Sequence, residues 1–198
     1  MTKIVATYRE QLKVKEDLFL STIRPSVDNF TIYDSPSEGY RTRIEFGLNK
    51  FDGKLGYSMV KDGIRFQVTE LSICHPKINE LMKKTIAHIN QDINLAKKLF
   101  QVEFQVSQKG ESMISLIYHR FLDEDWEKKA VTLSTAMESS IIGRSHKQCL
   151  VKGSNFVTEE YTTNKSKYEL RLYEQCFSQT NPSICNDMLN WVEENILT

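Results

Sequence analysis

The stretch that decides the fold is LFQVEFQVSQKGESMISLIYHRFLDEDW, residues 99–126. β-Branched and aromatic residues alternate with polar ones over residues 100–107 and again over residues 113–121, and a polar turn around Lys109-Gly110-Glu111 separates the two runs. This pattern predicts a β-hairpin. Because side chains alternate between the two faces of a strand, a slip of one residue would expose the apolar set, so the pattern also fixes the pairing.

The ends of the two predicted strands differ from their core faces. Phe100 at the start of the first strand and Tyr118-His119-Arg120 at the end of the second are where aromatic and basic groups leave the core pattern, and such a mixture suits stacking on a flat, anionic partner. On the first strand one face carries a regular series, namely Phe100, Val102, Phe104 and Val106.

Composition bounds the class of protein. The chain has 198 residues and 40% hydrophobic content, enough for one packed domain or one domain with an appendage. Lys plus Arg and Asp plus Glu are equal at 26 each, so any nucleic-acid binding depends on a local patch rather than on net charge.

The cysteines and the hydropathy pattern exclude two further classes of site. Cys74, Cys149, Cys176 and Cys185 form no C-x-x-C pair, so we expect no metal site. No signal peptide and no apolar run approaching about 18 residues is present, which predicts a cytoplasmic chain with reduced thiols and no membrane association.

Before the central stretch, apolar spacing predicts an amphipathic helix over residues 4–23 and a short strand at 30–33. Asp52-Gly53 and Asp62-Gly63 punctuate alternating runs and predict a meander of three antiparallel strands. Residues 76–90 carry a helical apolar stripe that begins at His75-Pro76.

After it, Asp123 is the expected N-cap of a helix, and a strand begins at Ile141. Residues 143–148 are expected to form a basic loop without an acidic neighbour. A second hairpin is expected next, with strands at 157–163 and 168–173. A final helix with Asn181 as its N-cap is expected at the end of the sequence.

Several basic residues are candidates for phosphate contacts. Arg41 and Arg43 share one face of the strand over residues 40–46, with about 7 Å between their Cα atoms, which is close to the spacing of adjacent phosphates. A solvated face tempered by Glu45 is the alternative interpretation. The same two interpretations apply to the lysines on the polar side of the predicted helix and just before the hairpin, which are Lys83, Lys84, Lys97 and Lys98.

Motifs for catalysis are missing from these 198 residues. There is no G-x-G-x-x-G, no G-x-x-x-x-G-K and no nucleophile elbow, so the residues alone indicate neither a nucleotide cradle nor an active site.

Four segments, taken in order, resemble the N-terminal half of the bacterial tRNA (uracil-5-)-methyltransferase family. They are YRTRIEF at 40–46, KLFQV at 98–102, SLIYH with LDEDW at 115–126, and FSQTN at 177–181, and the resemblance runs from Tyr8 to Trp191. It implies that the chain grips the T arm of tRNA, that Phe100 and His119 stack on loop bases, and that Arg41 and Arg43 contact the RNA backbone. Gln179 matches the F-x-Q-x-N glutamine that contributes to the S-adenosylmethionine site.

The resemblance also implies what lies outside these residues. The family continues into a doubly wound catalytic domain with a glycine-rich donor loop, a nucleophilic cysteine in an S-C-N-P setting and a glutamate base, and none of the four cysteines has that setting. We therefore expect a truncated or split enzyme that is not catalytic alone, with S-adenosylmethionine implied and its site incomplete.

The expected fold class is α+β, an antiparallel sheet with helices on one face. Residues 1–175 form the RNA-recognition domain, and residues 176–198 begin the connection to the catalytic domain. A separate catalytic chain is an alternative partner. The rival functions are a stand-alone RNA-binding or tRNA-folding protein and a protein-interaction remnant.

Overall fold

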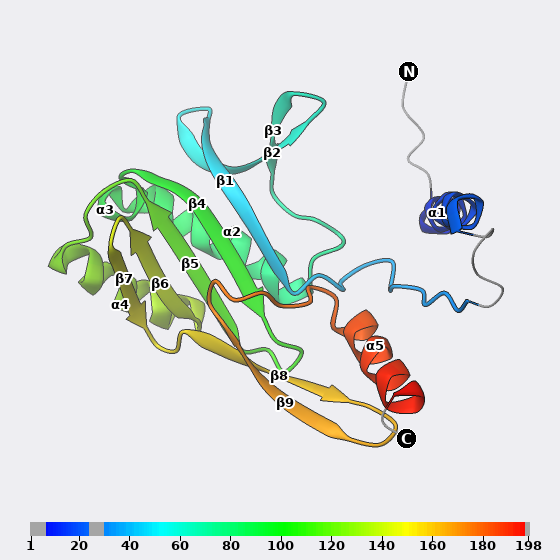
Figure 1. Cartoon of the computed structure of the whole chain (residues 1–198). Helices are drawn as coiled ribbons and strands as arrows, with labels where there is room; N and C mark the ends of the chain where they lie inside the picture. Colours follow the sequence, from blue (N-terminus) through cyan, green and yellow to red (C-terminus); the bar gives the residue numbers. More distant parts are fainter. Residues whose placement is uncertain (1–6, 24–29, 197–198) are drawn as a thin grey trace.

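The computed structural model describes residues 7–23 and 30–196 and confirms the α+β class (Figure 1). A seven-stranded sheet has the order β3-β2-β1-β4-β5-β6-β7, and β8 and β9 form a separate two-stranded sheet. The elements are α1 (Tyr8–Ile23), β1 (Arg43–Phe51), β2 (Lys54–Lys61), β3 (Ile64–Val68), α2 (Pro76–Gln91), α3 (Ile93–Ala96), β4 (Leu99–Val106), β5 (Ser112–Tyr118), α4 (Glu124–Met137), β6 (Ser140–Ser145), β7 (Gln148–Lys152), β8 (Phe156–Thr162), β9 (Lys167–Tyr173) and α5 (Pro182–Asn195).

The predicted central hairpin is confirmed as β4 and β5, which pair antiparallel. The register shifts between Leu99 and Gln101, because Leu99 lies opposite Tyr118 whereas Gln101 lies opposite Ile117. Phe100 is the extra residue of this β-bulge, and a bulge re-aims the side chain it carries. Phe100 leaves the core pattern at the start of β4, as expected, but it does not share the face of Val102, Phe104 and Val106: Leu99 is buried in its place, and Phe100 is only half-buried.

The predicted meander is confirmed as β1, β2 and β3, which pair antiparallel in order. Its two turns have positive φ at both central residues, with 48° and 80° at Asp52-Gly53 and 52° and 76° at Asp62-Gly63. Two consecutive residues of positive φ are the geometry that Asp-Gly pairs adopt in tight hairpins, so the sequence signal reflects a backbone requirement.

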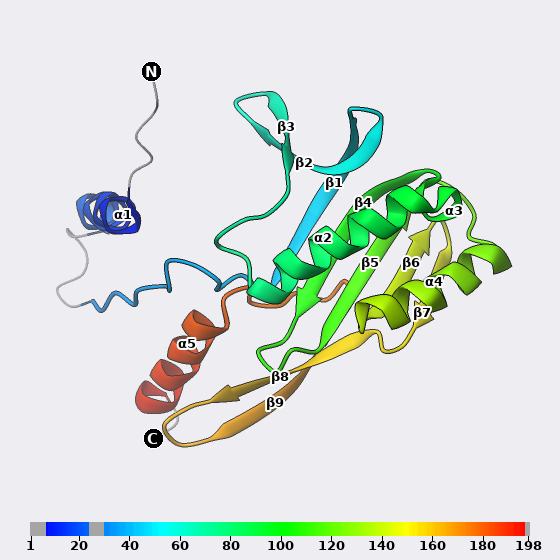
Figure 2. The ribbon, with the colours of Figure 1, turned by 180° about the vertical axis from the view of Figure 1, so that it is seen from behind.

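Helices α2 and α4 cover one face of the large sheet, as Figure 2 shows from behind. The helix predicted at 76–90 is confirmed as α2, and the Nδ1 atom of His75 caps it by accepting from the Lys77 backbone N–H at 3.2 Å. The core between the helices and the sheet is mainly apolar, with Thr85 of α2 as a buried polar residue. Its apolar members include Ile78, Leu81 and Met82 of α2, Val102 and Phe104 of β4, Ile114 and Leu116 of β5, and Trp126 and Leu133 of α4.

Strands β5 and β6 make the one parallel pairing among the described strands of the large sheet. Helix α4 connects them, and a crossover through a helix returns the chain in the same direction. Asp123 caps α4 as predicted, by accepting from the Trp126 backbone N–H at 2.9 Å. Trp126 then packs directly on Gly143 of β6, where a methyl group would come within 2.1 Å of the indole.

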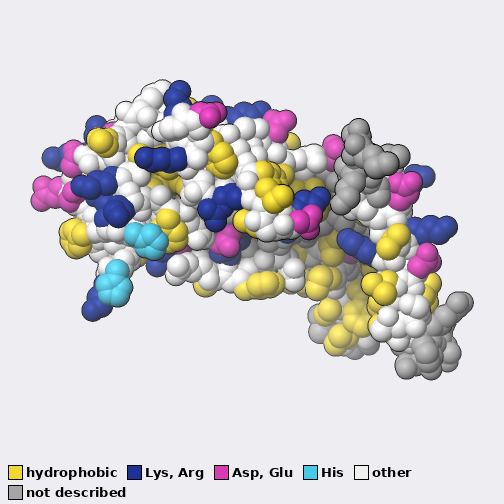
Figure 3. Space-filling model, turned by 90° about the horizontal axis from the view of Figure 1, so that it is seen from above, with side chains coloured by type: hydrophobic (Ala, Val, Ile, Leu, Met, Phe, Trp, Pro, Cys, Tyr) yellow, Lys and Arg dark blue, Asp and Glu magenta, His cyan; other side chains and the backbone are white. Residues whose placement is uncertain are grey.

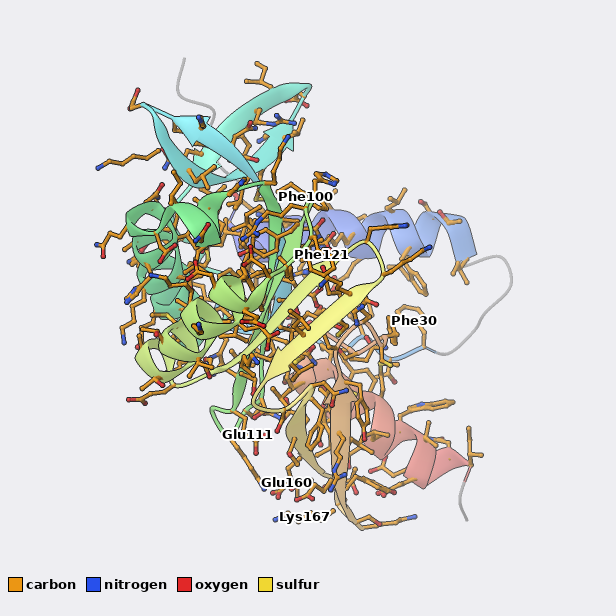
Figure 4. The ribbon with its side chains drawn as sticks, turned by 90° about the vertical axis from the view of Figure 1, so that its left-hand side faces the viewer. Phe30, Phe100, Glu111, Phe121, Glu160 and Lys167 are labelled. Carbon is orange, nitrogen blue, oxygen red and sulfur yellow. The ribbon has the colours of Figure 1, made fainter. Side chains whose placement is uncertain are left out.

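The second predicted hairpin is confirmed as β8 and β9, and it lies against the sheet face opposite α2 and α4. Met113, Ile142 and Val157 form a small buried cluster there. Figure 4 shows Glu111 of the first hairpin turn close to the β8–β9 hairpin, and its carboxylate accepts from the Thr158 backbone N–H at 2.7 Å. The predicted C-terminal helix is α5, which Asn181 caps.

Three expectations are corrected or fall partly outside the described residues. Residues 30–33 form irregular chain instead of a strand, since no strand edge pairs with them, and Phe30 packs edge-on against Phe19 of α1. Of the helix predicted at 4–23, residues 4–6 are outside the described residues. The basic loop at 143–148 is a continuation of β6 and β7 around a two-residue turn, and Arg144 pairs with Glu174.

No helix within residues 7–23 and 30–196 has the length and hydropathy to cross a membrane.

Replacing Gly143 by Ala tests the contact between α4 and β6. We expect Gly143→Ala to lower the free energy of unfolding by about 1–3 kcal/mol, because the fully buried Trp126 ring has no space to move. Gly47→Ala is the control, since its added methyl group would lie 3.6 Å from the Ser58 hydroxyl. Denaturant unfolding of the three proteins measures the difference, and equal midpoints would contradict the expectation.

Candidate nucleic-acid interface

Phe100 and His119 form a stacked pair at the end of the β4–β5 hairpin. Their ring centroids are 3.8 Å apart and the ring planes differ by 11°. The bulge in β4 supplies Phe100, and the backbone N–H of His119 donates to the Lys98 carbonyl at 2.9 Å, which fixes the start of the loop after β5. His119 is exposed, so a further flat ring can stack on the pair.

Tyr118 and Arg120, the residues next to His119 in sequence, are held by contacts within the chain. Tyr118 is buried and donates from its hydroxyl to the Leu95 carbonyl at 2.9 Å, and burial raises the pKa of this phenol. The Arg120 guanidinium donates to the carbonyls of Lys97 at 3.0 Å and Asn94 at 2.6 Å. Of the segment Tyr118-His119-Arg120, His119 is therefore the residue whose side chain is exposed, and the expectation that all three contribute to a stacking surface is corrected.

Basic groups lie around the stacked pair. Lys97 and Lys98 are exposed in the turn before β4, and His146 and Lys147 are exposed in the β6–β7 turn. Figure 3 shows histidine side chains among Lys and Arg side chains on the left half of the molecule, with Asp and Glu side chains at its left edge. A chain of zero net charge needs such a local group of basic side chains to bind a polyanion, although Asp123 interacts with Lys97 and offsets part of the charge.

The predicted arginines are engaged within the chain. The Nε atom of Arg43 donates to the Glu103 carboxylate, and its Nη1 atom donates to the Cys176 carbonyl. Arg41 is half-buried and donates to the Arg43 carbonyl at 3.4 Å. The structure does not bring Arg41 and Arg43 beside the stacked pair as two open guanidinium groups.

Two of the candidate lysines lie away from this end. Lys83 and Lys84 are on α2, and each forms an ion pair of 2.6 Å, with Glu70 and Glu80 respectively. Because α2 covers the opposite face of the sheet, these lysines are not near the stacked pair (Figure 2).

Residues 174–181, which we call the strap, cross the sheet face that α2 and α4 leave open. Glu174 anchors one end by accepting from Arg144 Nε at 2.6 Å and from Ser115 at 3.4 Å. At the other end the Thr180 carbonyl accepts from the Thr42 backbone N–H at 2.9 Å. The strap is therefore held on both sides of Gln179.

Gln179 is exposed, and so is Phe177, whose side chain is 84% exposed. An S-adenosylmethionine site needs a cradle for an adenosine and an amino-acid group, and one exposed amide does not supply it. The residues described here do not fit the donor on their own. No group of three or more His, Cys, Asp or Glu side chains in the described part of the chain is placed to hold a metal ion.

Sequence reasoning missed the bulge and the carboxylates of this face. Leu99 and Phe100 are adjacent apolar residues before a strictly alternating run, and this break in the alternation was the available signal for the bulge. Glu103 and Glu174 carried no local signal, because their arginine partners are 60 and 30 residues away in sequence.

Comparison with known proteins identifies the family. The family model described as tRNA (Uracil-5-)-methyltransferase matches residues 7–197. The chain belongs to the tRNA (uracil-5-)-methyltransferase family.

Curated relatives in the tRNA (uracil-5-)-methyltransferase family are about twice as long. The tRNA/tmRNA (uracil-C(5))-methyltransferase of Ectopseudomonas mendocina (strain ymp) is 37% identical over 193 residues, which are 96% of this chain and 53% of the relative. The one from Teredinibacter turnerae is 33% identical, over 94% of this chain and 52% of the relative. This chain thus spans about half the length of the curated relatives it matches.

A solved structure shares the fold. Pyrococcus abyssi tRNA (uracil-54, C5)-methyltransferase in complex with S-adenosyl-L-homocysteine aligns with a TM-score of 0.66 and 15% identity, over 94% of this chain and 48% of that chain.

The Arg144–Glu174 pair is expected to stabilise the protein. The Glu174 side chain is 4% exposed, and removal of its partner leaves a buried charge without compensation. We expect Arg144→Gln to lower the free energy of unfolding by about 2 kcal/mol, less than for a fully buried pair because the guanidinium is partly hydrated. Lys83→Gln, which removes an exposed ion pair, is the control and should leave the denaturation midpoint unchanged.

Proposed function

We propose that this chain is the tRNA-recognition part of a tRNA (uracil-5-)-methyltransferase and binds the T arm, in whose loop 5-methyluridine is formed. The observation that carries the proposal is the stacked pair of Phe100 and His119. In this proposal residues 1–175 recognise the RNA, and residues 176–198, with Gln179, begin the connection to the methyl-donor domain.

Stacking is the interaction that the recognition step needs most. A base inside a folded loop must leave its stack before it can be modified, at a cost of a few kcal/mol, and each base stacked on an aromatic side chain recovers roughly 1–3 kcal/mol. Phe100 and His119 are already parallel before RNA binds. A preformed platform reduces the ordering cost of binding, so more of the stacking energy contributes to affinity.

Phosphate contacts in this proposal come from the exposed lysines beside the pair. Lys98 adjoins His119 through a backbone hydrogen bond, and Lys97 precedes it in the same turn. Contacts to phosphates set the register of the RNA, while the stacked bases and the loop shape give selectivity.

Methyl transfer in this proposal needs residues beyond those present here. Among the family positions for the donor, Gln179 is the one this chain carries, and the donor is S-adenosylmethionine, since the Pyrococcus abyssi enzyme holds its demethylated product. The chain alone is expected to bind T-arm RNA without methylating it. A chain that carries the donor-binding fold is the partner that would restore methylation.

Binding of a T-arm hairpin tests the stacked pair. We expect Phe100→Ala and His119→Ala each to weaken binding by more than about 1 kcal/mol, because each removes one ring of the platform. Val131→Ala on α4 is the control, since α4 covers the opposite face of the sheet. Fluorescence anisotropy over a range of salt concentrations measures the affinity and the number of phosphate contacts.

Three results would count against this proposal. Binding that is unchanged by both ring substitutions would exclude the stacked pair as the recognition surface. Methylation of the hairpin by this chain with S-adenosylmethionine alone would exclude the non-catalytic role. A lack of RNA affinity together with dimerisation through Met188 and Trp191, both exposed on α5, would support a protein-interaction role instead.

A further inference from the structure

The strap is an irregular segment that hydrogen bonds hold on both sides of its exposed residues. Before Phe177, the Cys176 carbonyl accepts from Arg43 and the Glu174 carboxylate from Arg144. After Gln179, the Thr180 carbonyl accepts from the Thr42 backbone N–H, and Asn181 donates to the Ser35 hydroxyl at 2.7 Å.

The side chains between these anchor points face outward. Phe177 is 84% exposed and Gln179 is exposed, although the backbone on either side of them is bonded to the body of the protein. Holding an irregular segment costs conformational entropy, about 1–2 kcal/mol for each ordered residue, so the anchoring bonds must offset it. The backbone of the strap is therefore fixed to the body of the protein, while the side chains of Phe177 and Gln179 are exposed to solvent.

Arg43 holds the strap at Cys176, between the contacts of Glu174 and Thr180, and we call its two contacts, with Glu103 and with the Cys176 carbonyl, the clamp. Its side chain is 18% exposed and the Glu103 side chain is 12% exposed, so little of the ion pair is open to a ligand. Glu103 holds the guanidinium through Nε, and this orients the planar group so that Nη1 meets the Cys176 carbonyl.

We infer that Arg43 is a positioning residue that clamps the strap to the sheet through Glu103 and the Cys176 carbonyl, and thereby fixes where Phe177 and Gln179 are presented. The inference rests on the proposed function for the role of Gln179, whereas the clamp itself is described by the contacts of Arg43. It differs from a role in gripping phosphate, which would leave the guanidinium open toward RNA.

Lysine and glutamine substitutions distinguish the clamp from a phosphate contact. A lysine at position 43 keeps the charge but lacks the planar fork, so it cannot bond to Glu103 and to the Cys176 carbonyl in the same way. Both Arg43→Lys and Arg43→Gln should therefore loosen the strap. A phosphate contact, in contrast, would tolerate lysine.

Chymotrypsin cleavage measures the loosening. Cleavage after Phe177 requires the strap to leave the sheet, and cleavage after Phe121, which is 73% exposed, serves as the internal reference. We expect both Arg43 variants to raise the ratio of cleavage at Phe177 to cleavage at Phe121 by about tenfold or more, the factor for one charge-assisted hydrogen bond. Exchange of the Thr42 amide proton, measured by NMR, should accelerate in parallel.

Glu45→Gln is the matched control, because Glu45 pairs with Gln101 on the same sheet face and makes no contact with the strap among the hydrogen bonds of the described residues. It should leave the cleavage ratio unchanged. If Arg43 acts as a clamp, Arg43→Gln should also leave the salt dependence of T-arm binding unchanged. Loss of a phosphate contact would instead lower the slope of log affinity against log salt concentration by about 1.

Two results would overturn the inference. One is an unchanged ratio of cleavage at Phe177 to cleavage at Phe121 in both Arg43 variants. Equal acceleration at the two sites also leaves this ratio unchanged, and it would show a global loss of stability instead of a loosened strap. The other is a lower salt slope in Arg43→Gln that Arg43→Lys restores. A failure of Phe100→Ala to weaken RNA binding would count against the proposed function and leave the clamp unaffected.

Discussion

The bulge in β4 is the constraint on which the surface of this protein depends. A regular strand would carry Phe100 into the core with Val102, and Leu99 would then face solvent. The single extra residue buries Leu99 and turns Phe100 toward His119 without changing the apolar pattern of the rest of the strand. The core and the stacked pair are thus built by one hairpin, and the register that packs the core also sets the spacing of the two rings.

Electrostatic pairing explains why the open sheet face can carry arginines without being a general polyanion site. Arg43 and Arg144 each meet a carboxylate on the same face, Glu103 and Glu174, and each pair is mostly shielded from solvent. Such pairs fix geometry more than they attract ligands, because the field of each cation is cancelled nearby. Lys97 and Lys98, in contrast, are exposed beside the stacked pair, so charge and aromatic surface occur together at this end of the sheet.

Local chemistry made most of the fold predictable. Asp-Gly pairs predicted the meander because their turns need positive φ at two residues, and Asp123 and Asn181 predicted helix starts because their side chains cap free backbone N–H groups. The bulge and the ion pairs were not predicted, since they depend on which strands meet in space. Arg43 and Glu103 are adjacent only because β1 lies next to β4, and the parallel pairing of β5 with β6 follows from the packing of α4.

The same strand links the two functional regions. β4 carries Phe100 at its start and Glu103 three residues later, about 10 Å along a strand. In the proposed function, a base on the stacked pair would therefore lie near the start of β4, and the strap held through Arg43 and Glu103 would lie near its middle. A methyl group can be transferred only when the base and the donor meet at a fixed distance, and loss of that alignment is costly even when both bind well. From Gln101 to Gln105 the strand is paired on both sides, by β1 and β5, so it is a stiffer spacer than a loop, and this gives the proposed function a physical reason to use one sheet for RNA recognition and for the strap.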